Sequence, residues 1–287
     1  MTGRPGASVA STQTHLGQEC TTVLEPQRTG EGRGVLHLFL RVDHAAVPSL
    51  PPGAGKDVAD VLERWSERTQ LHVFSVLGHK ADVMLMAIDA DLTLLRTLQT
   101  EVQASLAAPA LTLTWSYLSL TEGSEYTQSP DEYRAYLTDE GVEGDDLDRR
   151  VAQFAERMEK YTDDKLHPQM PAWELACFYP MSHRRSGDDN WYSLDFAERR
   201  RLMHDHGRSG RAYTGRILQL VSGSTGLDEW EWGVTLFAHD LADVKDIVYT
   251  MRYDEASARY AEFGDFVIGL RRSPADLVAE VGLERTT

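Results

Sequence analysis

Two stretches of the sequence, ADVMLMAIDADLTLLR (residues 81–96) and EWEWGVTLFAHDLADV (residues 229–244), share one layout and decide the fold. In each, an apolar run typical of a strand is followed by an aspartate and then by apolar residues at helical spacing. Asp91 and Asp240 are placed to cap the following helix, because a carboxylate accepts hydrogen bonds from the first free backbone amides. The chain therefore contains an internal repeat.

Working outward from these stretches gives the order strand, helix, strand, strand, helix, strand twice. The first copy is predicted over residues 35–42, 57–68, 71–77, 81–88, 91–106 and 111–120. The second is predicted over residues 173–179, 195–207, 215–221, 229–238, 241–251 and 263–270. This order predicts an α+β fold: a duplicated ferredoxin-like chain, or dimeric α+β barrel, whose antiparallel sheets pack together.

Three parts of the chain follow from this layout. Residues 1–32 are predicted to be a disordered leader, because they are polar and lack periodicity. Residues 33–165 form the N-terminal half with an acidic connecting segment, in which a helix is expected near residues 146–161. Residues 166–287 form the C-terminal half, where a ligand pocket can open beside the sheet.

Composition narrows the class of function. The 287 residues carry a formal net charge of −16, which argues against nucleic-acid binding because that needs a basic face. No apolar run is long enough to span a membrane, and the N-terminus lacks an apolar signal core. Of the two cysteines, Cys177 lies in an apolar run and is expected to be a buried thiol, whereas Cys20 lies in the leader. A cytoplasmic location is therefore expected.

One histidine is a candidate metal ligand. A helix is predicted to start at the capping pair Asp195 and Glu198 and to end at Gly207, with Met203 and His206 on its apolar face. A core histidine bonded to a carbonyl is the simpler interpretation. The alternative is an axial ligand of an iron porphyrin, which needs only one protein donor. A zinc site is less favoured, because no second donor lies three or four residues away on that face.

Other candidates are polar residues in apolar surroundings. Gln219 lies in an apolar strand and either bonds to the backbone or faces a bound oxidant. Tyr179 ends a strand, where a packed ring with its hydroxyl at the rim is usual. Arg184 and Arg185 follow it and could attract carboxylates. Trp230 and Trp232 are expected to share a core-facing strand face.

Five separated segments together resemble the coproheme decarboxylases of the Firmicutes-type branch, within the chlorite-dismutase-like family. They are CFYPMS (177–182), DNWY (189–192), HG (206–207), GLDEWEWGVTLF (226–237) and YTMRYDEASARYAEFG (249–264). The likeness is dense over residues 172–270 and looser over 35–165. It implies a homopentamer that uses hydrogen peroxide to convert iron-coproporphyrin III (coproheme) to haem b, with a transient ferrochelatase contact.

The resemblance also implies roles for particular residues. His206 matches the proximal iron ligand, Tyr179 the catalytic tyrosine that forms a radical, and Gln219 the distal glutamine. The remaining matches are expected to contact the porphyrin or its propionates: Lys165, Tyr179, Pro180, Met181, Ser182, His183, Trp191, Gln219, Arg252 and Ser257. Without the resemblance, Arg252 and Ser257 read as part of a charged helix surface.

Two positions depart from the family pattern. His183 stands where the family usually has lysine, and Lys165 stands where it usually has arginine. Lysine keeps the charge but loses the bidentate fork, and a histidine contact is expected to depend on pH near neutrality. We therefore expect retained activity with altered substrate affinity.

Other functions stay open at this point. A chlorite dismutase is less favoured, because that activity goes with a distal arginine where this chain has Gln219. A haem carrier or sensor without catalysis, and a duplicated fold without a cofactor, are the remaining alternatives.

Overall fold

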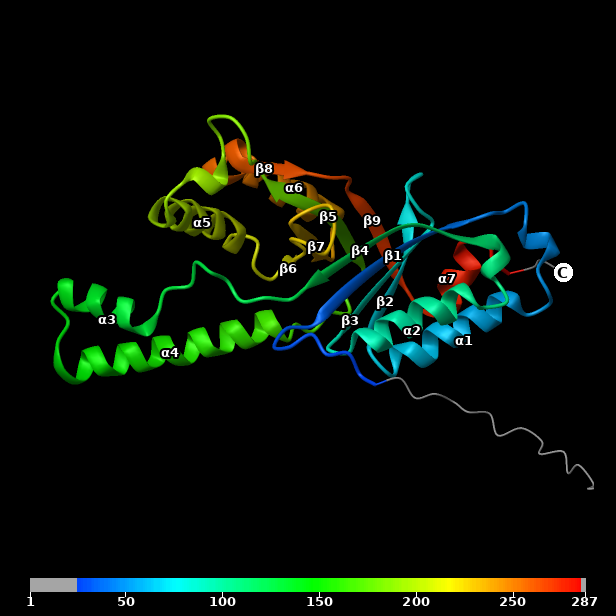
Figure 1. Cartoon of the computed structure of the whole chain (residues 1–287), viewed down its shortest axis with the longest axis horizontal. Coiled ribbons are helices and arrows are strands. Elements are labelled where there is room, and N and C mark those ends of the chain that lie inside the picture. Colours follow the sequence, from blue (N-terminus) through cyan, green and yellow to red (C-terminus); the bar gives the residue numbers. More distant parts are fainter. Residues whose placement is uncertain (1–24, 285–287) are drawn as a thin grey trace, which may run out of the picture.

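The computed structural model describes residues 25–284, and strands and helices there follow the predicted order (Figure 1). The first half contains β1 (Gly34–Val42), α1 (Ala54–Ser66), β2 (Gln70–Leu77), β3 (Val83–Asp89), α2 (Leu92–Gln103) and β4 (Leu111–Leu120). The connection forms a hairpin of α3 (Pro130–Asp139) and α4 (Gly144–Leu166). The second half contains β5 (Leu175–His183), α5 (Phe196–Arg211), β6 (Ile217–Gly223), β7 (Trp232–Ala238), α6 (Leu241–Met251), a π-helix η4 (Ala256–Tyr260), β8 (Ala261–Phe263), β9 (Val267–Arg272) and α7 (Pro274–Glu280).

The strands form one closed antiparallel sheet. Their order is β7-β6-β4-β1-β3-β2-β9-β5-β8, and a further β5–β7 pairing closes the ring and leaves β8 outside it. The order β4-β1-β3-β2 in the first half recurs as β9-β5-β7-β6 in the second. Where two packed sheets were expected, pairing of β2 with β9 and of β4 with β6 joins the halves edge to edge. Closure satisfies edge strands that would otherwise expose unpaired backbone groups.

Alternation along the strands sorts the apolar residues into separate cores. Phe39, Met84 and Phe178 belong to the cluster inside the ring. Leu38, Leu85 and the residues of α1, α2 and α7 that face them form a second cluster on the outer face of the first half. Figure 1 shows these three helices gathered against that face.

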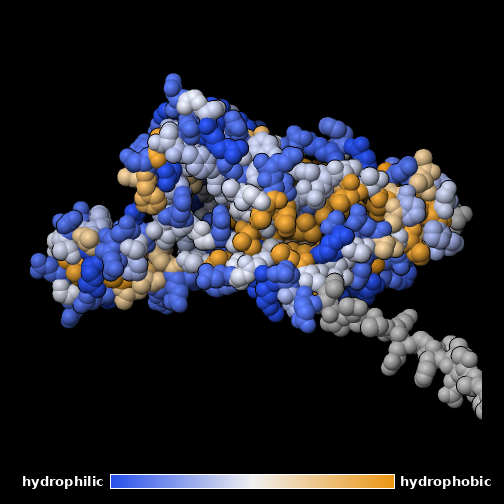
Figure 2. All heavy atoms as spheres, in the orientation of Figure 1, coloured by the Kyte–Doolittle hydropathy of each residue, from blue (hydrophilic) through white to orange (hydrophobic). Residues whose placement is uncertain are grey.

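The outer face of the second half is covered differently. α6 packs against β7, whereas α5 contacts mainly α6 and η4 rather than the sheet. Its counterpart α1 buries Val58, Leu62 and Trp65, but Leu202 is the buried residue of α5. In Figure 1, α5 stands away from the strands, and Figure 2 shows the surface hollowed between the lobe that carries α5 and the α3–α4 hairpin. The two copies of the repeat therefore differ in how the helix after their first strand packs.

Several boundaries differ from the sequence-based predictions. The prediction that Gly207 ends its helix was wrong: α5 continues to Arg211, and Gly207 is not among the glycines with positive φ. Trp230 and Trp232 do not share a face, because β7 starts at Trp232; Trp230 packs toward the interior of the ring.

The leader predicted over residues 1–32 lies only partly within the residues that the structure describes. Residues 1–24, including Cys20, lie outside the described residues. Residues 25–32 run beside the start of α2, where the Leu92 amide donates to the Gln27 carbonyl at 2.9 Å and the Thr29 amide donates to the Ala90 carbonyl at 3.1 Å. Ordered structure therefore begins before the boundary expected at residue 33. Within residues 25–284, every helix is too short or too polar to cross a membrane.

Candidate functional site

The candidate site residues of β5 divide between two faces of the sheet. Tyr179 belongs to the outer cluster of the second half and Met181 packs against it, whereas Phe178 lies inside the ring. Because successive side chains alternate, His183 follows on the outer face, and Pro180 and Ser182 point the other way. Pro180 and Ser182 were predicted to contact the porphyrin, but the structure places their side chains on the opposite face.

Gln219 extends this outer face across two strands. Cys177 pairs with Leu236 of β7, and Leu236 pairs with Gln219 of β6. The Gln219 side chain is exposed, although its neighbours Ile217 and Leu220 are buried. An exposed amide on an apolar face can donate to a bound molecule. Cys177 is 1% exposed, which confirms the expected buried thiol, and burial raises its pKa to about 12.

His206 is coupled to a buried carboxylate. Its Nδ1 lies 3.2 Å from Oδ2 of Asp254, whose side chain is only 7% exposed. Ser257 holds the same carboxylate: its amide donates to Oδ1 at 2.9 Å and its hydroxyl to Oδ2 at 3.0 Å. Although burial raises the pKa of Asp254, the bonds from His206 and Ser257 outweigh this and the net pKa is lowered. The carboxylate therefore stays ionised and accepts from Nδ1–H.

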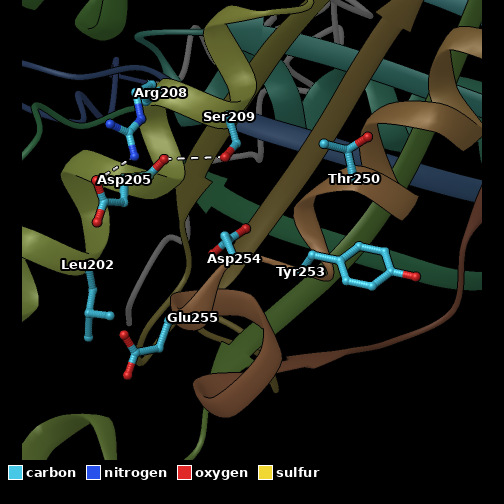
Figure 3. Close-up of a pocket in the computed structure, with 8 residues that line it drawn as sticks. All are labelled: Leu202, Asp205, Arg208, Ser209, Thr250, Tyr253, Asp254 and Glu255. Atoms are coloured by element: carbon cyan, nitrogen blue, oxygen red, sulfur yellow. Dashed lines mark hydrogen bonds and ion pairs between the residues drawn. The ribbon is translucent and has the colours of Figure 1, made fainter.

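This pairing determines what His206 can do. A carboxylate that accepts from Nδ1–H leaves the lone pair on Nε2, the arrangement that metal-binding histidines usually show. Asp254 also lines a cavity of about 390 Å³ between α5 and the segment that joins α6 to η4. Figure 3 shows Asp205, Arg208 and Ser209 lining it from α5. The carboxylate that holds His206 thus also borders this cavity.

Sequence reasoning missed Asp254, which lies between Arg252 and Ser257 in the stretch that reads as a charged helix surface. The residue was detectable as a cap, because Asp254 and Ser257 have the spacing at which a side chain accepts from a backbone amide three residues later. Its burial was not detectable, because it depends on how η4 packs beside α5. Ser257 was expected to contact a propionate, but its hydroxyl is engaged with Asp254 and lies 3.4 Å from Nδ1 of His206.

His183 and Trp191 form an aromatic wall at the end of β5. Their rings stack with centroids 4.1 Å apart and planes 10° from parallel. Trp191 is 2% exposed, and Trp232 meets the edge of His183 at 4.9 Å. Burial, and to a smaller extent the neighbouring His206, lowers the pKa of His183 to about 4. The expectation that this histidine titrates near neutrality was therefore wrong: it is a neutral imidazole at pH 7.

Tyr179 sits in an aromatic setting on the same face. Its ring stacks on Phe266 at 4.4 Å and meets Phe263 edge-on at 5.8 Å. Arg252 lies over the Phe263 ring at 5.2 Å. Burial and the neighbouring Cys177 raise the pKa of the Tyr179 phenol above its usual value, although Arg252 opposes this. The phenol therefore keeps its proton across the physiological range.

Lys165 is the predicted residue that the structure leaves apart. It lies in the last turn of α4, with its ammonium 5.6 Å from the ring centroid of Tyr161. Among residues 25–284, no hydrogen bond or ion pair joins Lys165 to the residues of β5 or α5.

The donor set fits an iron porphyrin. A macrocycle supplies four nitrogen ligands, so one imidazole with a free Nε2 completes the protein's share. The buried Nδ1 of His183 has no hydrogen-bond partner in the described part of the chain, so a polar ligand group could use it. Gln219 and Arg252 add an amide and a cation to the same side of the protein.

Comparisons with known proteins agree with this setting. The sequence model of the chlorite dismutase family matches residues 53–272. Two relatives are named for haem binding: one from Natronomonas pharaonis is 37% identical over 92% of this chain, and one from Haloquadratum walsbyi is 39% identical over 88%. This chain spans only 43% and 46% of their lengths.

Solved structures show the same fold. A haem-binding protein from Thermus thermophilus has a TM-score of 0.72 and 35% identity, over 88% of this chain and 96% of that one. A chlorite dismutase variant from Candidatus Nitrospira defluvii has a TM-score of 0.66 and 17% identity, over 88% and 97% of the two chains. At that identity the second likeness concerns the fold alone. From the matched sequence model and the two relatives together, the chain belongs to the chlorite dismutase family.

Proposed function

We propose that this protein binds coproheme through His206 and decarboxylates two of its propionates with hydrogen peroxide, giving haem b. The observation that carries the proposal is the His206–Asp254 pair, which leaves Nε2 available, together with the protonated phenol of Tyr179 on the outer face of β5. For each side chain the balance is propionic acid plus hydrogen peroxide giving a vinyl group, carbon dioxide and two waters. The propionate is oxidised by two electrons, and the peroxide is reduced by two.

The chain's residues divide this work between them. The bound iron porphyrin supplies oxidising equivalents drawn from peroxide, and the protein supplies geometry. His206 holds the iron, and Gln219 offers an amide hydrogen bond to the small oxidant. Tyr179 carries a transferable hydrogen atom, because its raised pKa keeps the phenol protonated. Phe263 and Phe266 pack on that ring and restrict its orientation.

Substrate carboxylates need donors near Tyr179. Arg252 can supply a cationic fork, and it is exposed at the surface of the described chain. His183 supplies a neutral N–H rather than a charge, so its contribution to affinity is a directional hydrogen bond. We propose that Ser257 acts on His206 through Asp254. We propose that Lys165 only attracts the substrate carboxylates from a distance.

The finer description of the fold and assembly is also a proposal. The recurring strand order supports a duplicated ferredoxin-like barrel. Homopentamer formation, a cytoplasmic location and a transient ferrochelatase contact rest on the family resemblance alone.

The test compares wild type with Tyr179→Phe, using Tyr249→Phe as the control because Tyr249 is 59% exposed. Each protein is loaded with coproheme and titrated with peroxide, and the porphyrin mass is read at each step. Wild type and control should lose two carboxyl groups as carbon dioxide, whereas Tyr179→Phe should bind coproheme and keep its mass. Full conversion by Tyr179→Phe would refute the role of the phenol.

A haem carrier is the second candidate, and one observation favours it: two relatives and one solved neighbour are named for haem binding rather than for a reaction. The same experiment separates the two functions. A carrier leaves the coproheme mass unchanged in wild type after peroxide addition.

A further inference from the structure

β5 extends past the end of the strand beside it. The last β5–β7 pair joins Met181 to Trp232, so β7 offers no backbone acceptor to His183 two residues later. The Glu231 carboxylate takes that place: its Oε2 accepts from the His183 amide at 2.8 Å. The Glu231 amide in turn donates to the Met181 carbonyl at 3.1 Å. A side chain thus continues the ladder where the backbone stops.

Glu231 is a buried carboxylate with several partners. It is 5% exposed, and a charged group is rarely buried to this extent unless it is paired. Its Oε1 lies 3.8 Å from Nε of Arg185, at the start of the loop that follows β5. At the other end of that loop, burial and the neighbouring Glu231 carboxylate raise the pKa of the Tyr192 phenol. Glu231 therefore pairs with the start of the loop and lies close to its end.

The same loop carries Trp191. Its amide donates to the Arg184 carbonyl at 3.0 Å, which brings the loop back to the end of β5. The Trp191 ring then stacks on His183, the residue whose amide Glu231 holds. Glu231 thus holds the backbone of the residue on which the Trp191 ring stacks, and it pairs with Arg185 at the start of the loop that carries Trp191.

We propose that Glu231 is a positioning residue: it holds the loop of residues 184–192 closed, so that Trp191 and His183 form the wall against which the porphyrin binds. The part concerning the porphyrin rests on the proposed function, whereas the part concerning Trp191 does not. Glu231 touches neither the substrate nor the iron, so its removal should weaken porphyrin binding rather than slow the reaction of bound substrate.

The variants are Glu231→Ala, Glu231→Gln and Tyr192→Phe, with Glu229→Ala as a matched control because Glu229 is an exposed carboxylate two residues away. Glutamine keeps a side-chain oxygen that can accept from the His183 amide. Glu231→Gln should therefore behave like wild type where Glu231→Ala does not. It also keeps the test valid if Glu231→Ala impairs folding. Tyr192→Phe removes only the hydroxyl whose pKa Glu231 raises, and it should give a smaller defect than Glu231→Ala.

The first measurement is acrylamide quenching of tryptophan fluorescence in the protein without porphyrin. Glu231→Ala should add a readily quenched component that disappears in the Trp191→Phe/Glu231→Ala double variant. Glu231→Gln and Glu229→Ala should match wild type. If Trp191 stays protected in a folded Glu231→Ala protein, Glu231 does not position it and the proposal is overturned.

The second measurement is binding of metal-free coproporphyrin III, which removes the bond between iron and His206 from the comparison. Glu231→Ala should bind about tenfold more weakly, the effect of losing one hydrogen bond to a charged group, and Glu231→Gln within about twofold of wild type. With coproheme and peroxide, KM should rise and kcat should change little. If Glu231→Ala exposes Trp191 but binds coproporphyrin III as tightly as wild type, the proposal that Trp191 and His183 form the porphyrin-binding wall is refuted. If wild type does not bind coproheme itself, the proposed function fails, and quenching alone still decides the role of Glu231.

Discussion

Replacing His183 by phenylalanine tests the aromatic wall through the pH dependence of stability. Phenylalanine keeps an aromatic ring beside Trp191, which stacks on the imidazole with centroids 4.1 Å apart, and leaves the backbone bond to Glu231 in place. It removes the one titrating group of the wall. Any difference in pH dependence between the two proteins is therefore due to protonation of His183.

The magnitude follows from the pKa of His183, which burial lowers from 6.5 to about 4. Between these values the unfolded chain binds a proton that the folded protein does not, so folding becomes less favourable as the pH falls. One pKa unit corresponds to about 1.4 kcal/mol, so wild type should lose about 2 kcal/mol relative to the variant by pH 5 and about 3 kcal/mol by pH 4. Above pH 7 this contribution is constant. Burial also lowers the pKa of His37, to about 3, but both proteins contain His37 and its contribution cancels.

The assay is urea unfolding of both proteins, followed by circular dichroism at half-unit steps from pH 8 to pH 4. The difference in unfolding free energy should be flat above pH 7 and then change in favour of the variant. Parallel profiles over the whole range would mean that His183 titrates in the folded protein as it does in the unfolded chain, and the buried wall would be refuted.

Three further outcomes are expected. Trp191→Ala should lower the unfolding free energy by about 3–5 kcal/mol in urea titrations, because it empties a buried site, whereas the half-exposed neighbour Tyr192→Ala should cost less than about 1 kcal/mol. Arg200→Ala removes a two-bond contact with Glu132 that ties the α3–α4 hairpin to α5; global stability should change by less than about 1 kcal/mol, but amide exchange at the start of α3 should accelerate. Asp254→Asn should weaken haem affinity about 10–100-fold in transfer assays to apomyoglobin, since the amide no longer fixes the Nδ1–H tautomer; unchanged transfer would contradict the pairing with His206.

Most of the fold could be predicted from local sequence patterns. Apolar periodicity gave the strands and helices of both halves, and Asp91 and Asp240 do cap their helices. α3 and α7 were missed, although each begins with serine at the cap and proline next, with an acidic residue three positions after the cap. Both helices could therefore have been predicted from the sequence. Closure of the sheet could not be predicted, because the strand pairings that join the halves link residues about 100–200 positions apart.

The candidate site was predictable only in outline. Alternation along one strand places the side chains of Tyr179 and His183 on one face and those of Pro180 and Ser182 on the other, a distinction that a family motif alone does not make. The two carboxylates that hold the site together, Asp254 and Glu231, were missed. Each looks like an ordinary charged residue in sequence, and each is buried because a distant segment packs over it. His183 is neutral at pH 7 for the same reason, because it is buried by residues that are distant in the sequence.

The central claim is that His206 holds the iron of a bound porphyrin. Resonance Raman spectra of the ferrous haem complex report the iron–histidine bond directly, in wild type, in His206→Ala and in the control His204→Ala, whose side chain is 71% exposed. The iron–histidine band should be present in wild type and His204→Ala, absent in His206→Ala, and replaced by an iron–imidazole band when free imidazole is added to that variant. An unchanged band in His206→Ala would contradict the account.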